Sequence, residues 1–252
     1  MNDESPAPGR PVLLVTGGSR GIGAAVCRLA GAQGFDVAVN YKQDAEAAAR
    51  VVDDVTKSGS RAVAIQGDMS DESEVARVFE AVDKRLGRLT HLVYNSGIPG
   101  PMARVEAMET EALRSVFELN VFGAFYAARA AIPRISTRHG GKGGAMVLIS
   151  SITATLGAPG VYVWYAASKG AIDTMTKGLS LELADDHIRV NAVTPGLTDT
   201  GVNEPARVAQ VVPLIPMKRI GAPTEIAQSV VFLLSDAASY ITGANLRVSG
   251  GR

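Results

Sequence analysis

Cysteine is almost missing from this sequence, since Cys27 is the only one among 252 residues. A lone cysteine excludes an intrachain disulfide and fits a protein of a reducing compartment. Histidine is also scarce, and His91, His139 and His187 lie too far apart for the short spacings typical of a metal site. We therefore expect no catalytic metal, and we interpret Cys27 as a buried structural thiol.

Excess charge and long apolar runs are absent as well. The 25 basic residues balance the 25 acidic ones, so neither nucleic acid nor an anionic membrane is expected as a partner. No uncharged stretch reaches the roughly 18 apolar residues of a membrane span. Residues 1–10 lack the apolar core of a secretory signal, and we expect them to form a flexible tail. The sequence predicts a cytoplasmic protein with one catalytic domain over 11–252.

Glycine, in contrast, is abundant, with 27 residues, and the hydrophobic share of 46% is enough for a large core. Short apolar runs alternate with helix-length segments along the chain. The expected strands are 12–16, 37–40, 62–65, 92–94, 145–150, 188–193 and 244–248. Because these runs are almost continuously apolar, helices should cover both faces of the sheet. The pattern predicts an α/β fold, a single-domain doubly wound Rossmann fold with a mostly or wholly parallel seven-stranded sheet.

A glycine-rich turn follows the first expected strand and opens the first expected helix. It reads Thr16-Gly17-Gly18-Ser19-Arg20-Gly21-Ile22-Gly23. Gly17 permits a sharp turn, Gly21 lets the backbone approach a pyrophosphate, and Gly23 lets the helix pack closely on the strand. Free N–H groups at the helix N-terminus favour an anion, so the turn predicts a dinucleotide site. A turn that only reverses the chain is the alternative.

The spacing of this turn, Gly-x-x-x-Gly-x-Gly, resembles that of the short-chain dehydrogenase/reductase family, and the resemblance covers almost the whole of 11–252. Members include 3-oxoacyl-[acyl-carrier-protein] reductases and glucose dehydrogenases. Further matching segments follow other expected strands, although Asp68 could equally be a helix N-cap. The cofactor-binding residues that the resemblance implies are Gly17, Ser19, Arg20, Gly21, Ile22, Gly23, Asn40, Tyr41, Lys42, Asp68, Met69, Asn95, Ser96, Gly97, Tyr165, Lys169, Pro195, Gly196, Thr198 and Thr200.

Tyr165 and Lys169 stand four residues apart, on one face of an expected helix. A cation beside a phenol favours the phenolate and brings its pKa toward the working range. Taken alone, the pair could be a solvated helix face. Ser151 ends the fifth expected strand, at the edge where open sheets bind ligands. The resemblance makes Ser151, Tyr165 and Lys169 a catalytic triad, with Ser150 as the alternative serine because the interval to Tyr165 is one residue longer than expected.

Asn120 lies in an apolar helix, where an unpaired amide is costly. The resemblance implies that it is catalytic, holding a backbone carbonyl and a water that links Lys169 to solvent. A polar group that kinks the helix or lies in an interface is the alternative. Apolar residues surround more than one face of this helix, which favours a homotetramer or a homodimer. They are Val116, Leu119, Phe122, Phe125 and Tyr126.

NADP(H) is the expected cofactor, with NAD(H) as the alternative. An NAD site usually has Asp or Glu at the end of the second strand, where this sequence has Asn40. Arg20 and Lys42 are cations that could bind a 2′-phosphate, and Arg20 is favoured because a guanidinium offers two donors. Ordinary surface cations are the alternative interpretation of both.

These residues predict an NAD(P)(H)-dependent oxidoreductase that transfers hydride between nicotinamide and a small carbonyl or alcohol substrate, with Tyr165 as acid and base. The alternative is a catalytically silent dinucleotide-binding sensor or scaffold. Residues 201–220 contain three prolines and should form a lid over the substrate. Trp164 could line the pocket, pack in the core or contact another subunit.

Overall fold

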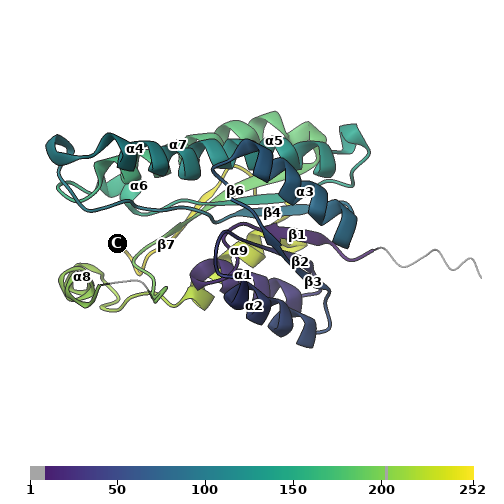
Figure 1. The fold of residues 1–252 in the computed structure, drawn as a ribbon, viewed down its shortest axis with the longest axis horizontal. Helices are drawn as coiled ribbons and strands as arrows, with labels where there is room; N and C mark the ends of the chain where they lie inside the picture. The colour runs from purple at the N-terminus through teal and green to yellow at the C-terminus, as the bar shows by residue number, and fades with distance from the viewer. Residues whose placement is uncertain (1–8, 202–203) are drawn as a thin grey trace, which may run out of the picture.

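The computed structural model describes residues 9–201 and 204–252, and these form one sheet with helices on both sides (Figure 1). All paired strands are parallel, in the order β3-β2-β1-β4-β5-β6-β7. The strands are β1 (Val12–Val15), β2 (Asp36–Tyr41), β3 (Ala62–Gln66), β4 (His91–Tyr94), β5 (Gly144–Ile149), β6 (Ile188–Pro195) and β7 (Asn245–Val248). The predicted doubly wound fold is confirmed, and the sheet is wholly parallel.

Two helical layers cover the sheet, as Figure 1 shows. On one side lie α1 (Gly21–Ala32), α2 (Ala45–Lys57) and α9 (Pro223–Leu234). On the other lie α3 (Glu72–Leu86), α5 (Gly123–Ile135) and α7 (Val163–Glu182). Each layer shares an apolar core with one face of the strands, so the apolar runs are buried from both sides. No helix in the described part of the chain is long and apolar enough to cross a bilayer.

The remaining helices are short and lie around the ends of the strands. They are α4 (Thr110–Phe117), α6 (Thr153–Leu156) and α8 (Pro205–Val211). A π-helical turn, Glu118–Phe122, joins α4 to α5. α8 and the short 3-10 turn after it, Val212–Leu214, occupy the predicted lid segment, of which residues 202–203 lie outside the described residues.

Most strand boundaries fall within a residue of those predicted. The largest difference is at β6, which continues to Pro195 because Thr194 and Pro195 pair with Arg247 and Val248 of β7. Of the predicted tail, residues 1–8 lie outside the described residues. Arg10 is held in place, since its guanidinium donates to the carbonyl of Gly59 at 2.5 Å.

The topology brings several predicted segments to one edge of the sheet. The chain order reverses beside β1, which lies between β2 and β4, and such a switch point opens a crevice at the carboxyl ends of the strands. The glycine turn follows β1, Asn95 follows β4 and Ser151 follows β5. Parallel strands all end at the same edge, so these segments meet there.

Candidate active site

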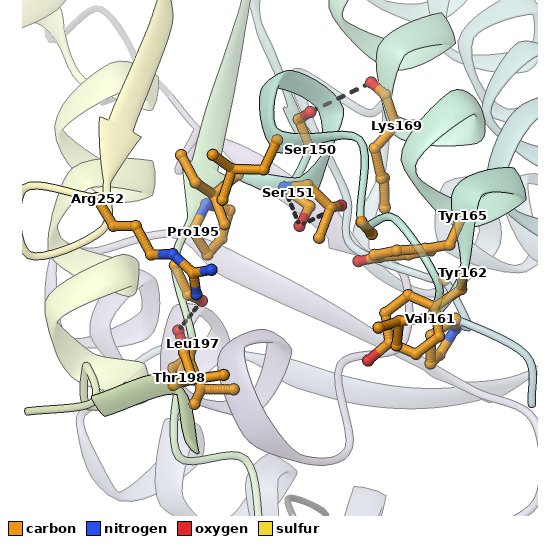
Figure 2. Close-up of a pocket in the computed structure, with 18 of the residues that line it drawn as sticks. Ser150, Ser151, Val161, Tyr162, Tyr165, Lys169, Pro195, Leu197, Thr198 and Arg252 are labelled. Atoms are coloured by element: carbon orange, nitrogen blue, oxygen red, sulfur yellow. Dashed lines mark hydrogen bonds between the residues drawn. The ribbon is translucent and has the colours of Figure 1, made fainter. Parts of the chain in front are cut away.

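A cavity of about 730 Å³ lies at this edge. It brings together Ser151, Tyr165 and Lys169, which come from the end of β5 and the first two turns of α7 (Figure 2). Predicted cofactor residues line the same cavity: Ile22, Asn95, Gly97, Pro195, Gly196, Thr198 and Thr200. The cavity therefore joins the glycine turn to the predicted catalytic residues.

The two candidate serines have different surroundings. The Ser151 hydroxyl accepts hydrogen bonds from the amide and the hydroxyl of Thr153, at 3.2 and 2.9 Å, and it interacts with Tyr165. The Ser150 hydroxyl is buried and donates to the carbonyl of Lys169 at 3.3 Å, as drawn in Figure 2. Ser151 is thus the serine whose hydroxyl lies beside the Tyr165 phenol.

Lys169 is buried, with 4% of its surface exposed. Its ammonium donates to the carbonyl of Ile149 at 2.8 Å and lies 5.9 Å from the centre of the Tyr165 ring. Burial lowers the pKa of Lys169 to about 8, although the Asp173 carboxylate acts in the opposite direction. A lysine with this pKa exchanges a proton near neutral pH more readily than an exposed lysine.

The expected effect of Lys169 on Tyr165 requires a correction. Burial raises the pKa of Tyr165, and the hydrogen bond with Ser151 lowers it by less. The net shift of the Tyr165 pKa is upward although the Lys169 ammonium lies 5.9 Å from the centre of the ring, with its hydrogen bond directed to the Ile149 carbonyl at 2.8 Å. In this structure, therefore, the phenol is held in its protonated form.

Asn120 has the partners that its burial requires. It lies in the π-helical turn, and its amide donates to the carbonyl of Ile98 at 2.9 Å and to the hydroxyl of Ser168 at 3.0 Å. Its oxygen accepts from the amide of Ile98 at 2.9 Å. A Cβ on Gly97 would lie 3.1 Å from this oxygen and 3.2 Å from the Lys169 ammonium. Asn120 and Lys169 therefore converge on the backbone that follows β4.

The glycine turn has the geometry of a close-packed anion site. Gly17 and Gly21 adopt positive φ angles of 59° and 54°, which glycine tolerates best. A Cβ on Gly23 would lie 2.3 Å from the Gly17 carbonyl oxygen, so only glycine fits there. No side chain caps the N-terminus of α1, and its free N–H groups would suit the phosphates of a dinucleotide. Thr200 lies against Gly21 and extends this surface.

Two asparagines hold the turn in position. Asn95 donates to the carbonyls of Thr16 and Gly17, at 3.0 Å each. Asn40 is buried, accepts from the Gly17 amide at 3.2 Å and donates to the carbonyl of Gly67 at 3.0 Å. Asn40 was predicted to be a cofactor-binding residue, and these bonds show that its side chain also has a structural task.

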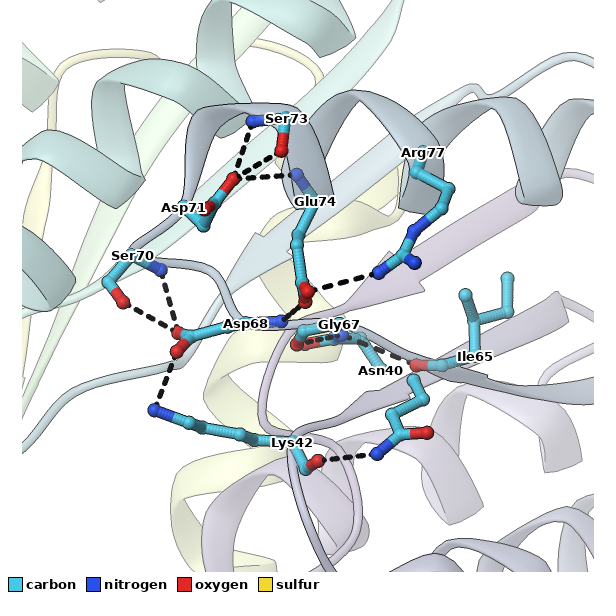
Figure 3. Close-up of polar contacts among 11 residues, drawn as sticks. Asn40, Lys42, Ile65, Gly67, Asp68, Ser70, Asp71, Ser73, Glu74 and Arg77 are labelled. Carbon is cyan, nitrogen blue, oxygen red and sulfur yellow. Dashed lines mark hydrogen bonds and ion pairs between the residues drawn. The ribbon is translucent and has the colours of Figure 1, made fainter.

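At the other end of the predicted cofactor site, polar side chains are already paired (Figure 3). The Lys42 ammonium lies 2.6 Å from the Asp68 carboxylate, which also accepts two bonds from Ser70. Burial alone would raise the pKa of Asp68, but Lys42 and Ser70 together lower it. Arg20, in contrast, is exposed at the N-terminus of α1. Of the two predicted phosphate ligands, Arg20 is the one without an ion pair among the described residues.

The sequence did not indicate every residue of the cavity. Tyr162, Arg207 and Arg252 also line it, and no motif contains the two arginines. Trp164, whose place was left open, is buried and packs in a cluster with Val116 and Tyr162. Among the described residues, no group of three or more His, Cys, Asp or Glu could hold a metal ion.

Comparison with known proteins identifies the family. The family model described as "Enoyl-(Acyl carrier protein) reductase" matches residues 17–252. The "Uncharacterized oxidoreductase YgfF" of Escherichia coli is 47% identical over 245 residues, covering 96% of this chain and 99% of that protein. The structure of a mutant short-chain dehydrogenase/reductase from Serratia marcescens superimposes with a TM-score of 0.91 at 33% identity, covering 96% and 97% of the two chains.

The chain belongs to the short-chain dehydrogenase/reductase family. A second structural neighbour, a short chain dehydrogenase from Burkholderia cenocepacia in complex with NADP, has a TM-score of 0.89 at 35% identity, covering 96% and 97% of the chains. This short-chain dehydrogenase/reductase is an NAD(P)-dependent oxidoreductase, and the alternative of a silent sensor is not supported.

Proposed function

We propose that this short-chain dehydrogenase/reductase is an NADP(H)-preferring enzyme that interconverts a small carbonyl compound and its alcohol. The observation that carries the proposal is the cavity at the edge of the sheet, where Ser151, Tyr165 and Lys169 meet Ile22 of the glycine turn. A bound nicotinamide would supply or take up the hydride at the substrate carbon.

The contacts of the residues support the roles that we propose for them. Ser151 and Tyr165 donate hydrogen bonds to the substrate oxygen, and Tyr165 gives its proton to that oxygen during reduction. The raised pKa of Tyr165 suits this acid role, because the phenol is protonated before the reaction. Thr153 holds the Ser151 hydroxyl in position.

Lys169 and Asn120 support proton movement at Tyr165. Lys169 is buried beside the phenol and has a pKa of about 8, so it can return a proton after each turnover. Asn120 fixes the backbone of Ile98 beside Lys169 and keeps a path for protons open. In oxidation the same groups act in reverse, and Tyr165 accepts the proton of the alcohol.

The preference for NADP(H) rests on the charge near the end of β2. Arg20 is exposed and unpaired by any described carboxylate, and it is the proposed partner of the 2′-phosphate. Two structural neighbours are complexes with NADP and with NADPH. Asp68 and Met69 would then lie beside the adenine, and Thr198 and Thr200 beside the nicotinamide half.

We also propose a lid and an oligomer. α8 and the turn after it contribute Arg207, Gln210, Val211 and Leu214 to the cavity wall, so their movement would admit and cover substrate.

Phe122 and Phe125 are 49% and 50% exposed on the outer face of the helix that contains Asn120. A second subunit packed against these two rings would remove them from water, which favours a homodimer or homotetramer. Sedimentation at micromolar concentration would test this. A cytoplasmic location, proposed from the single buried Cys27, would be tested by cell fractionation.

The decisive experiment is a panel of aldehydes, ketones and alcohols, measured by nicotinamide absorbance with NADP(H) and NAD(H) in parallel. We expect turnover of at least one carbonyl–alcohol pair, with a higher kcat/KM for NADP(H). Tight cofactor binding without turnover of any compound would contradict the proposed function. Turnover with equal or better use of NAD(H) would contradict only the cofactor preference.

A further inference from the structure

The charged side chains around the cavity are all of one sign. None of the described residues that line it is Asp or Glu, whereas three of them are cations, Lys169, Arg207 and Arg252. The rest of the lining is polar or apolar. Lys169 belongs to the proposed catalytic group, so the two arginines are positive charges that the proposed reaction leaves without a role.

Arg207 is held in place by groups that do not neutralise it. Its guanidinium carbon lies 4.9 Å from the centre of the Tyr162 ring, and one nitrogen donates to the sulfur of Met102 at 3.7 Å. The Tyr162 ring packs edge-on against the Tyr165 ring, with 5.8 Å between centroids. Only one aromatic ring therefore separates this cation from the phenol that would protonate the substrate.

Among the described residues, Glu204 is an acidic group that acts on the same tyrosine as Arg207. Glu204, at the start of α8, is exposed, and its charge acts on Tyr162 in the direction opposite to that of Arg207. Arg207 forms no ion pair with any described residue, Glu204 included. Its charge is thus free to attract an anion that enters the cavity.

Arg252 reaches the cavity from the opposite wall. Its main-chain oxygen accepts from the Ser249 hydroxyl at 2.7 Å, and its half-buried side chain extends toward Pro195 and Leu197 (Figure 2). Its guanidinium has no hydrogen-bond partner in the described part of the chain. Another partly buried arginine, Arg189, donates to four backbone carbonyls, as a desolvated guanidinium should.

We infer that this cavity selects carbonyl substrates that carry an anionic group, a carboxylate or a phosphate, bound between Arg207 and Arg252. The inference rests on the proposed function and names its substrate class. The carbonyl of such a substrate would meet Ser151 and Tyr165, while its carbon skeleton would lie against the apolar side chains of Leu156, Val161, Val211 and Leu214. Charge-assisted hydrogen bonds from two guanidiniums would fix the orientation of the substrate.

A matched pair of probes tests the anion site, 4-formylbenzoate and its uncharged methyl ester. Binding of each is measured by calorimetry to the protein saturated with NADP⁺, and reduction by the loss of NADPH absorbance. In the reduction, hydride from NADPH reaches the aldehyde carbon and a proton reaches its oxygen, giving the alcohol and NADP⁺. We expect the carboxylate to bind at least about tenfold more tightly than the ester, as one charge-assisted bond implies.

The variants Arg207→Gln and Arg252→Gln should each weaken binding of the carboxylate about tenfold and leave the ester unchanged. Arg207→Lys should restore part of the affinity because it keeps the charge. Arg50→Gln removes a positive charge from the exposed face of α2 and serves as the control, with no expected change. A second pair, 4-formylphenyl phosphate and 4-methoxybenzaldehyde, distinguishes a phosphate site from a carboxylate site.

Three results would overturn the inference. The first is equal binding of both members of each pair, and the second is a preference for the charged member that is unchanged in both Gln variants. The third is a Gln variant whose main defect is weaker binding of NADP⁺. The last would mean that the arginine serves the cofactor. Failure of the proposed function has a different signature, because then the anion binds through the two arginines while no carbonyl oxidises NADPH.

Discussion

The two ends of the site are built in different ways. At the end where β2 and β3 finish, the polar side chains already bind each other, as Lys42 does with Asp68. At the other end, Arg207 and Arg252 face the cavity without a carboxylate partner among the described residues. A cofactor would therefore have to exchange existing partners or use Arg20, whereas an anionic substrate would gain contacts without breaking any. The first end is suited to a constant ligand and the second to selection among substrates.

Of the changes at the catalytic end, Tyr165→Phe should lower the turnover rate the most. The ring remains, but the proton that the substrate oxygen needs is lost, so kcat should fall by at least about 10³-fold. The Kd for NADP(H), measured by fluorescence titration, should stay within about threefold of wild type. Tyr162→Phe is the control, because that ring lines the same cavity and should retain most of the activity. Near-normal turnover by Tyr165→Phe would assign the acid role to another group.

Ser151→Ala and Ser150→Ala separate the two serines. Loss of the Ser151 hydroxyl should lower kcat/KM about 10²-fold, the usual cost of one donor to a developing oxyanion. Loss of the Ser150 hydroxyl removes the bond to the Lys169 carbonyl and should mainly lower thermal stability, by about 1 kcal/mol. Steady-state kinetics and melting curves of both variants measure this. A larger catalytic defect in Ser150→Ala would exchange the two roles.

Gly23→Ala tests the cofactor end through its packing. The new Cβ would lie 2.3 Å from the Gly17 carbonyl oxygen and 2.7 Å from the Asn95 amide nitrogen, so the turn must shift. Such overpacking costs about 1–3 kcal/mol, and affinity for either cofactor should fall as well. The control Gly178→Ala lies on the exposed side of α7 with no atom within 4 Å of its Cβ, and should be neutral or stabilising. Urea unfolding and cofactor titration distinguish the two.

Arg20→Ala addresses the contrast between free and paired cations. If Arg20 binds the 2′-phosphate, its removal should reduce the NADP(H)-to-NAD(H) preference by about tenfold to a hundredfold. Lys42→Ala should have a smaller effect, since Lys42 is already paired with Asp68. Arg28→Ala, on the same helix and paired with Asp54 at 2.8 Å, controls for loss of charge. An unchanged ratio in Arg20→Ala would remove Arg20 from the cofactor site.

The sequence predicted features formed by contiguous residues better than features formed by residues far apart in the chain. Alternating apolar runs predicted all seven strands, and contiguous motifs such as 16–23 and 165–169 predicted the segments that meet at the sheet edge. Arg207 and Arg252 lie in no motif, and only the folded chain brings them to one cavity. Asn40 was in the expected segment, but its hydrogen bonds to Gly17 and Gly67 depend on the pairing of β2 with β3. Pairing and burial across distant segments leave no local pattern.

The pH dependence of stability tests the burial of Lys169 in the cofactor-free protein. The pKa of Lys169 is about 8 in the folded protein, compared with 10.5 for an unperturbed lysine in the unfolded chain. Below pH 8 the folded protein therefore carries a desolvated charge. Between these values the unfolded chain binds a proton that the folded protein has released, so the free energy of unfolding rises with pH.

Lys169→Met removes this group while keeping an unbranched side chain of comparable length. The difference in unfolding free energy, wild type minus variant, should therefore increase from pH 8 to pH 10.5, by at most about 1.4 kcal/mol per pH unit. Below pH 8 and above pH 10.5 it should be constant, because the folded and unfolded states then bind the same number of protons at this site. Taking the difference cancels the titration of tyrosines shared by both proteins. Urea midpoints across this range measure it, and a flat difference would mean that the ammonium of Lys169 is solvated in the folded protein, leaving its proton relay to Tyr165 without a physical basis.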